Sequence, residues 1–122
     1  MKPKQIVVCE DDIKALRDLR IVFNTNQSKI LKEFSEGIEF LEWFKKNSQQ
    51  VDLIILDILL KKMDGFALFH EIKKIKSQIP IIIFSIENSI SVVKYLVSEG
   101  ARDYITKPYQ LEQLKQRLSK YI

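Results

Sequence analysis

The sequence predicts one α/β domain, a doubly wound (βα)5 unit in which helices cover both faces of a parallel five-stranded sheet. Strand-like and helix-like segments alternate five times along the 122 residues, and no linker separates them. Three of the strand-like runs are apolar at every position, as is usual when both faces of a sheet are covered. Because the length suits a single hydrophobic core, we expect residues 1–122 to form one domain.

The expected strands are short hydrophobic runs bounded by polar or turn residues. In chain order they cover residues 6–9, 29–34, 53–56, 81–84 and 103–106. The second and fifth runs carry charged side chains, which places them at the sheet edges, and the other three belong at its centre. With right-handed crossovers, this pattern gives the strand order 2-1-3-4-5, the flavodoxin-like form of the doubly wound sheet.

The expected helices are recognised by apolar residues that recur at intervals of three and four. In chain order these are Ile13, Leu16, Leu19 or Arg20, and Phe23; Phe40, Leu41 and Phe44; Leu68, Phe69, Ile72 and Ile75; Ile90, Val93, Leu96 and Val97; and Leu111, Leu114, Leu118 and Ile122. Turn residues at 24–26, 64–65 and 99–100 mark three of the boundaries between elements. Each expected strand is therefore followed by a helix.

Composition argues against several classes of protein. No apolar stretch approaches the roughly 20 residues that a membrane-spanning helix needs, and the N-terminus does not read as a signal peptide. Cys9 is the only cysteine and lies in a predicted core strand, so we expect no disulfides and a cytoplasmic location. The net charge of +4 comes from dispersed lysines, including Lys73 and Lys76, which we interpret as solvated helix faces rather than a nucleic-acid-binding surface.

Polar residues follow the strands at their carboxyl ends, and a sheet of this order brings them together. Asp57 follows the third strand, and Glu10 and Asp11 follow the first. The strand order reverses direction between these two strands, so three carboxylates are expected in one crevice. Ser85 and Lys107, from the ends of the fourth and fifth strands, can reach the same crevice.

This set of side chains suits a divalent cation and a phosphoryl group. Two carboxylates about 5 Å apart repel by roughly 3 kcal/mol at an effective dielectric constant near 20, so we expect a cation among them. Oxygen ligands favour Mg²⁺ or Mn²⁺, and the only histidine, His70, lies in a helical segment and cannot build a zinc site. Asp57 is the best candidate for a carboxylate nucleophile that accepts a phosphoryl group. Lys107 and Ser85 can bind the phosphoryl oxygens.

Four motifs resemble those of one family, the receiver (phosphoacceptor) domain of two-component response regulators. They are VCEDD at 8–12, LDILLKKMDG at 56–65, FS at 84–85 and GARDYITKPY at 100–109. The acidic pair alone is weakly specific, but the four motifs in this order and at these spacings are highly specific. The resemblance covers the chain from Val7 to the last helix.

The resemblance implies a phosphoacceptor signalling switch. A partner histidine kinase or phosphotransfer protein would phosphorylate Asp57 transiently, with Mg²⁺ held by Asp11, Asp57 and the backbone carbonyl of Leu59. Glu10 would bind a metal-coordinated water. Such a domain catalyses only its own phosphoryl transfer and dephosphorylation, so we expect no other enzymatic activity.

The resemblance also implies a route from the site to the surface. Ser85 and Tyr104 would be the switch pair, and Lys107 would bind the phosphate and precede a cis peptide to Pro108. The surface formed by the fourth helix, fifth strand and fifth helix would then change and control a downstream protein or output domain, or pair with a second copy. Its exposed residues are expected to be Lys94, Tyr95, Arg102, Asp103 and Arg117. We expect no direct contact of this domain with nucleic acid or membrane.

Two residues depart from the family pattern. Lys61 follows Leu60 where the family usually has proline, which loosens a turn, and Ile86 stands where the family has a small residue and could restrict access to the site. Competing enzyme classes fit less well, because a haloacid-dehalogenase-type phosphatase needs an aspartate where Leu59 stands. A flavin binder would meet an acidic loop that repels phosphate. The remaining alternative is a degenerate receiver that acts as a phosphorylation-independent interaction module.

Overall fold

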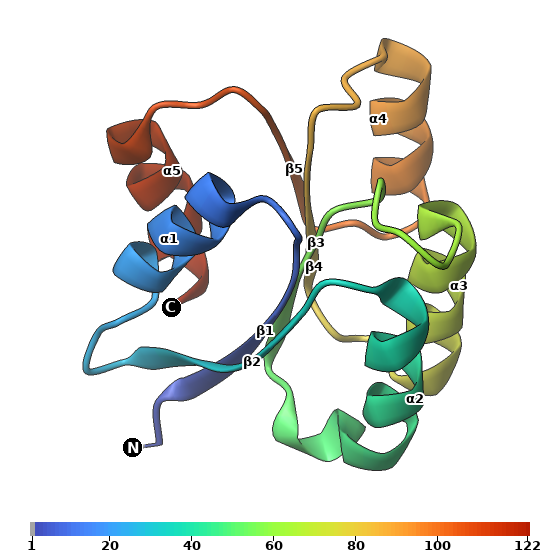
Figure 1. The fold of residues 1–122 in the computed structure, drawn as a ribbon, viewed down its shortest axis with the longest axis horizontal. Coiled ribbons are helices and arrows are strands. Elements are labelled where there is room, and N and C mark those ends of the chain that lie inside the picture. Colours follow the sequence, from blue (N-terminus) through green and yellow to red (C-terminus); the bar gives the residue numbers. More distant parts are fainter. Residues whose placement is uncertain (1) are drawn as a thin grey trace.

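The computed structural model describes residues 2–122 as a five-stranded parallel sheet between two layers of helices (Figure 1). The strands are β1 (Lys4–Cys9), β2 (Ser28–Phe34), β3 (Leu53–Leu56), β4 (Ile81–Ser85) and β5 (Asp103–Thr106). The helices are α1 (Ile13–Val22), α2 (Gly37–Asn47), α3 (Gly65–Ile75), α4 (Ile90–Ser98) and α5 (Leu111–Leu118), with short 3-10 helices at Ser48–Gln50 and Ser119–Tyr121. The strand order is β2-β1-β3-β4-β5, which confirms the predicted fold.

The core has two halves, one on each face of the sheet. Side chains alternate along β1, so Ile6 and Val8 pack against α1 and α5, whereas Val7 and Cys9 pack on the opposite face. Figure 1 shows α1 and α5 on one face and α2, α3 and α4 on the other. Residues 6–9 of β1 and all of β3 and β4 are buried. The runs 6–9, 53–56 and 81–84 are apolar at every position because both faces of the sheet are covered there.

Two helices differ in detail from the apolar patterns that located them in the sequence. In α4 only Leu96 is buried, whereas Ile90 and Val97 of the same apolar pattern are 73% and 49% exposed. The last helix ends at Leu118 and does not reach Ile122. The spacing of apolar residues therefore predicts where these helices lie in the sequence, but not which of their residues are buried.

Two lysines that were expected to be solvated bind the backbone instead. The amino group of Lys76 donates to the carbonyl oxygens of Ser48 at 2.9 Å and Val51 at 2.7 Å. The amino group of Lys73 donates to the carbonyl oxygen of Ile79 at 3.2 Å. These contacts hold the end of α3 against the loops that precede β3 and β4.

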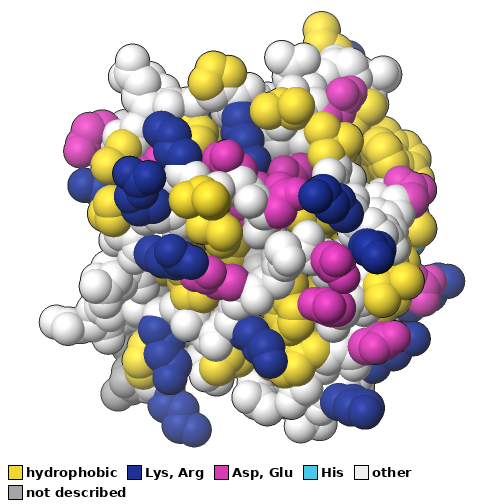
Figure 2. All heavy atoms as spheres, in the orientation of Figure 1, with side chains coloured by type: hydrophobic (Ala, Val, Ile, Leu, Met, Phe, Trp, Pro, Cys, Tyr) yellow, Lys and Arg dark blue, Asp and Glu magenta, His cyan; other side chains and the backbone are white. Residues whose placement is uncertain are grey.

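The surface of the molecule carries charges of both signs. Figure 2 shows lysine and arginine side chains interspersed with acidic and hydrophobic ones over the visible face. Across residues 2–122, none of the helices combines the length and hydrophobicity needed to cross a bilayer.

Candidate functional site

The acidic residues of the candidate site are fixed by hydrogen bonds of the sheet itself. The backbone N–H of Glu10 donates to the carbonyl of Phe34 at the end of β2, at 2.9 Å, and that of Asp57 donates to the carbonyl of Cys9, also at 2.9 Å. Glu10 and Asp57 are buried, with 1% and 6% of their surface exposed, whereas Asp11 is exposed. The parallel sheet thus carries both buried carboxylates at its carboxyl edge, as the sequence predicted.

The three carboxylates form a tight group. Oxygens of Glu10, Asp11 and Asp57 all lie within 4.8 Å of one another. One oxygen of Glu10, Oε2, accepts hydrogen bonds from the backbone N–H groups of Asp11 at 3.0 Å and Asp12 at 3.1 Å. The other oxygen, Oε1, lies 2.6 Å from the amino group of Lys107, but among the described residues it accepts no well-directed hydrogen bond. We therefore treat that contact as an ion pair that leaves Oε1 able to accept another partner.

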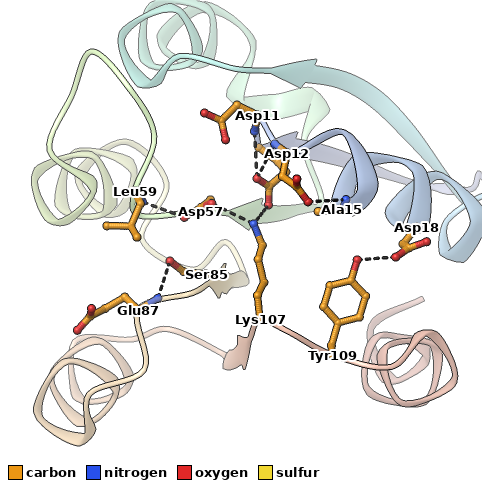
Figure 3. A network of polar contacts seen from close by, with 11 residues as sticks. Asp11, Asp12, Ala15, Asp18, Asp57, Leu59, Ser85, Glu87, Lys107 and Tyr109 are labelled. Atoms are coloured by element: carbon orange, nitrogen blue, oxygen red, sulfur yellow. Dashed lines mark hydrogen bonds and ion pairs between the residues drawn. The ribbon is translucent and has the colours of Figure 1, made fainter.

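Lys107 reaches into this group from the end of β5. Its backbone N–H donates to the carbonyl of Ser85 at 2.9 Å, and its peptide bond to Pro108 is cis, as the resemblance implied. Its amino group lies 2.6 Å from Glu10 and 3.2 Å from Asp57. Figure 3 shows this side chain directed at the carboxylates.

Two pKa values at this site are raised, for different reasons. Burial raises the pKa of Glu10 above its usual range, and the contact with Lys107 and a hydrogen bond from the Asp12 backbone offset this only in part. Burial would lower the pKa of Lys107, but contact with the carboxylates of Glu10 and Asp57 raises it. The lysine is therefore charged, and the carboxylates remain in excess of it.

The loop after β3 shapes the position of Asp57. Oδ1 of Asp57 accepts a hydrogen bond from the backbone N–H of Leu59 at 2.9 Å. Gly65 lets α3 begin directly beneath this loop, since a Cβ there would lie 2.1 Å from the carbonyl oxygen of Ile58. The carbonyl of Lys61, the residue in place of the family's proline, accepts from Gly37 at 3.2 Å, so the loop is anchored to α2.

Ser85 and Tyr104 both contact the backbone of Glu87, two residues after the end of β4. Ser85 is fully buried, and its hydroxyl oxygen accepts from the backbone N–H of Glu87 at 3.3 Å. The hydroxyl of Tyr104 donates to the carbonyl oxygen of Glu87 at 2.5 Å. Burial, with smaller effects of Glu87 and Asp57, raises the pKa of Tyr104 to about 12.

The role of Tyr104 as a switch residue stays a prediction, and the structure places its ring in the core. The ring is buried, with 7% of the surface of the residue exposed. It packs in the core half that α2, α3 and α4 cover. A switch that uses Tyr104 therefore has to change its bond to the Glu87 carbonyl rather than move the ring inward from solvent.

A cavity of about 570 Å³ opens above the carboxylates. Its lining is Asp11, Asp12, Lys14, Asp57, Leu59, Ile86, Lys107, Pro108 and Tyr109. Ile86 and Leu59 are 63% and 52% exposed and belong to this lining. The effect of Ile86 on access stays a prediction.

The surface of α4, β5 and α5 carries fewer free charges than the sequence indicated. Asp103 and Arg117 were expected to be exposed, but both are half-buried and form an ion pair with each other. Lys94, Tyr95 and Arg102 of the same surface are exposed. His70 does not belong to the cluster of Glu10, Asp11 and Asp57. Its Nε2 atom lies 2.9 Å from the hydroxyl oxygen of Tyr95.

Sequence reasoning missed two residues near the site. Asp18 is 7% exposed and accepts a hydrogen bond from the hydroxyl of Tyr109 at 2.5 Å. The signal was present, because Asp18 falls three residues after Ala15 and four before Val22, on the stripe of α1 that faces the core. A carboxylate in that stripe requires a partner.

The sequence and fold match one family across nearly the whole chain. The pattern of the response regulator receiver domain family matches residues 6–119. The probable C4-dicarboxylate response regulator DctR of Bacillus subtilis is 38% identical over 86 residues, which are 70% of this chain and 36% of that protein. The chemotaxis protein CheY of the same organism is 28% identical over 116 residues, or 95% of each protein. The chain therefore spans only about a third of DctR but nearly all of CheY.

Solved structures share the fold. The CheX-CheY-BeF3-Mg²⁺ complex from Borrelia burgdorferi contains a chain with a TM-score of 0.87 and 24% identity, covering 98% of this chain and 90% of that one. The phosphorylated cyanobacterial phytochrome response regulator RcpA gives a TM-score of 0.82 and 25% identity, covering 98% and 91%. The arrangement of strands and helices is thus common to all three proteins.

Proposed function

The chain belongs to the response regulator receiver domain family, and from this membership we propose that it acts through transient phosphorylation of Asp57. As a receiver domain it is a signalling switch of two-component systems. We assign residues 1–122 to this one domain. The observation that carries the proposal is the meeting of three carboxylates and one lysine at the carboxyl ends of β1, β3 and β5.

The proposed reaction transfers a phosphoryl group from a phosphohistidine to Asp57. A carboxylate oxygen of Asp57 attacks phosphorus, a P–O bond forms, and the P–N bond breaks as its electron pair returns to the imidazole. The leaving nitrogen takes up a proton. Lys107, 3.2 Å from Oδ2 of Asp57, is placed to bind an oxygen of the transferred group. Hydrolysis of the resulting acyl phosphate by water would return the domain to its resting state.

The cluster of three carboxylates, from Glu10, Asp11 and Asp57, fits Mg²⁺, or Mn²⁺ with the same oxygen ligands. Three carboxylates face one lysine, and Oε1 of Glu10 is buried without a well-directed hydrogen bond among the described residues. Asp11, Asp57 and the carbonyl of Leu59 would hold the ion, and Glu10 would bind one of its waters. When bound, the cation supplies positive charge that offsets carboxylate repulsion and attracts the phosphoryl oxygens.

The switch would act on the backbone of Glu87. Ser85 accepts from its N–H and Tyr104 donates to its carbonyl, so the two proposed switch residues contact two consecutive peptide units that meet at this residue. The hydroxyl hydrogen of Ser85 is free to turn toward a phosphoryl oxygen on Asp57. Drawing Ser85 toward that oxygen would pull on the backbone of Glu87 and on the bond from Tyr104, and so displace the start of α4.

The partners would use two surfaces. A histidine kinase or phosphotransfer protein would dock over the site, where Leu59 and Ile86 line the cavity and are 52% and 63% exposed. Ile13 and Ile90, the first residues of α1 and α4, are 74% and 73% exposed and would add apolar surface to this contact. A downstream protein, an output domain or a second copy would bind the surface of α4, β5 and α5.

Phosphate labelling tests the proposed function. Incubation with Mg²⁺ and radiolabelled acetyl phosphate should add one acid-stable, base-labile phosphoryl group, and Asp57→Asn should abolish the labelling. Asp52→Asn is the matched control, because Asp52 is an exposed aspartate that immediately precedes the same strand. Full labelling of Asp57→Asn would contradict the assignment. Absence of label from the parent with acetyl phosphate and with phosphorylated kinases would favour the degenerate-receiver alternative.

Chemical-shift mapping tests the switch. Beryllofluoride with Mg²⁺ should shift amide signals mainly between residues 85 and 117. Ser85→Ala and Tyr104→Phe should each confine the changes to the neighbourhood of Asp57, since each removes one bond to the backbone of Glu87. Shifts that extend to α4 and α5 unchanged in both variants would show that the Glu87 backbone does not carry the signal.

A further inference from the structure

A third buried carboxylate, Asp18, lies on α1 outside the acidic crevice. The residues that share its buried face of the helix are Ala15, Leu19 and Val22. Burying a carboxylate among apolar side chains costs free energy unless its oxygens are bonded. Oδ2 of Asp18 accepts from the hydroxyl of Tyr109 at 2.5 Å and from the amino group of Lys14 at 3.0 Å. These two donors compensate the burial.

Tyr109 belongs to the segment that carries Lys107. Only Pro108 separates the two residues, and Figure 3 shows Lys107 directed at the acidic cluster while Tyr109 is directed at Asp18. The ring of Phe84 lies under both, with its centroid 5.0 Å from the Tyr109 ring and 5.0 Å from the amino group of Lys107. The segment 107–109 is thus held to β4 by packing and by the hydrogen bond from the Lys107 backbone to Ser85, and to α1 by the hydrogen bond from Tyr109.

α1 is in turn fixed relative to the acidic cluster. It begins directly after Asp11, and its N-cap Asp12 accepts from the backbone N–H of Ala15 at 2.9 Å. A bond from Tyr109 to α1 therefore sets the distance between the segment that carries Lys107 and the end of β1 that carries Glu10. The amino group of Lys14, 4.8 Å from the Tyr109 ring centroid, packs against the other side of the same contact.

We propose that Asp18 and Tyr109 are positioning residues, whose hydrogen bond holds segment 107–109 against α1 so that the amino group of Lys107 stays within reach of a phosphoryl group on Asp57. This inference rests on the proposed phosphorylation of Asp57. Lys107 has to exchange its carboxylate contacts for phosphoryl oxygens during transfer. The bond from Tyr109 keeps the backbone in place while the head of the side chain moves.

The test separates positioning from stability by comparing three variants. Tyr109→Phe removes only the hydroxyl, and it should slow labelling by acetyl phosphate about three- to tenfold, because small displacements of a catalytic group lower its contribution. Its Mg²⁺ affinity, measured by calorimetry, should stay within about twofold of the parent, because none of the proposed ligands moves. Asp18→Asn keeps an acceptor for Tyr109 and should retain most of the parental rate. The double variant Asp18→Leu/Tyr109→Phe should recover thermal stability relative to Tyr109→Phe and remain slow.

Tyr121→Phe is the matched control, since it removes a second tyrosine–aspartate hydrogen bond, to Asp103 at 3.3 Å, at the amino end of β5, whereas Lys107 follows the carboxyl end of that strand. It should label at the parental rate. Parental labelling by Tyr109→Phe, or recovery of the rate together with stability in the double variant, would overturn the proposal.

A readout that needs no phosphodonor distinguishes this proposal from the proposed function. The ε-methylene NMR signals of Lys107 should shift in Tyr109→Phe and not in Tyr121→Phe. If the parent takes no label while these signals shift as expected, the positioning contact stands and phosphorylation of Asp57 is wrong. If the parent takes label and the signals do not shift, the positioning role is wrong and the proposed function stands.

Discussion

Two buried carboxylates, Glu10 and Asp18, each lie beside a lysine, yet their surroundings shift their pKa values in opposite directions. Burial raises the pKa of Glu10, and bonds from Lys107 and the backbone do not overcome this effect. Burial also acts on Asp18, but hydrogen bonds from Tyr109 and Lys14 outweigh it and lower the pKa of that carboxyl. The distance to a lysine is similar, at 2.6 Å for Glu10 and 3.0 Å for Asp18.

The difference lies in the other neighbours. Asp18 accepts hydrogen bonds from the hydroxyl of Tyr109 and the amino group of Lys14, so its carboxylate has donors within the chain. Glu10 shares one lysine with Asp57 and stands within 4.8 Å of both other carboxylates. A buried carboxylate that has hydrogen-bond donors within the chain, such as Asp18, stabilises the fold. A cluster in which negative charges outnumber positive ones, such as that of Glu10, Asp11 and Asp57 with Lys107, is suited to binding a ligand. The comparison therefore separates a structural contact from a binding site without reference to sequence motifs.

The largest expected effect on stability comes from removing the hydrogen-bonded carboxylate of Asp18. Asp18→Ala should lower the free energy of unfolding by about 2–4 kcal/mol, because it leaves the Tyr109 hydroxyl without its acceptor and opens a gap under α1. Urea unfolding measures the change. The control is Glu71→Ala, which removes an exposed ion pair with Lys74 and should change stability little. Equal losses in the two variants would show that the Asp18 contact contributes no more than a surface pair.

The fold and the acidic crevice were predictable because both depend on local patterns. Apolar runs mark the central strands, and parallel pairing then carries the residue after each run to the same edge of the sheet. Glu10, Asp57 and Lys107 each follow a strand directly, so their convergence required only the strand order. Their roles in catalysis and metal binding stay predictions.

The contacts of long side chains could not be predicted in this way. Tyr109 and Asp18 are 91 residues apart, and their bond depends on how α1 packs beside the loop before α5. Tyr104 lies on an edge strand, where the sequence does not reveal that α4 covers its ring. Lys76 reaches carbonyls across a loop 25 and 28 residues away. Each case combines a flexible side chain with a partner that only the tertiary structure supplies.

The next largest expected effect is the stabilisation by Mg²⁺ that binds the cluster of Glu10, Asp11 and Asp57. At a free Mg²⁺ concentration about ten times the dissociation constant, binding should add roughly 1.4 kcal/mol to the stability of the parent by mass action. Asp11→Asn should remove most of this gain, because it withdraws an exposed carboxylate of the group. Melting temperatures with millimolar MgCl₂ and with EDTA measure the effect. An equal rise in the variant and the parent would place the metal elsewhere.

A smaller effect is expected when one charge of the group is neutralised without metal. Glu10→Gln should raise the free energy of unfolding in EDTA by about 1 kcal/mol. It removes the cost of burying a negative charge and the repulsion from Asp57, and together these exceed the free energy of the lost ion pair with Lys107. The sign is opposite to that for Asp18→Ala, so the pair of variants tests the comparison directly. Destabilisation by Glu10→Gln would mean that Lys107 satisfies Glu10 as fully as Tyr109 satisfies Asp18.

The smallest expected effect is on the pH dependence of stability in EDTA. The pKa of Asp18 is lowered in the folded state, so its contribution is present above its ordinary pKa of 3.8 and is lost as the pH falls through the folded value. The pKa of Glu10 is raised, so its contribution is present below its ordinary pKa of 4.5 and is lost as the pH rises through the folded value.

Two variants isolate these limbs of the pH profile. Asp18→Asn should flatten the loss of stability on the acid side of pH 3.8, whereas Glu10→Gln should flatten the loss that begins above pH 4.5. Urea unfolding across a series of pH values gives both slopes, because the slope reports the difference in bound protons between the unfolded and folded states. If both variants changed the same limb, the two carboxylates would titrate alike, and the distinction between the hydrogen-bonded carboxylate of Asp18 and the cluster that contains Glu10 would fail.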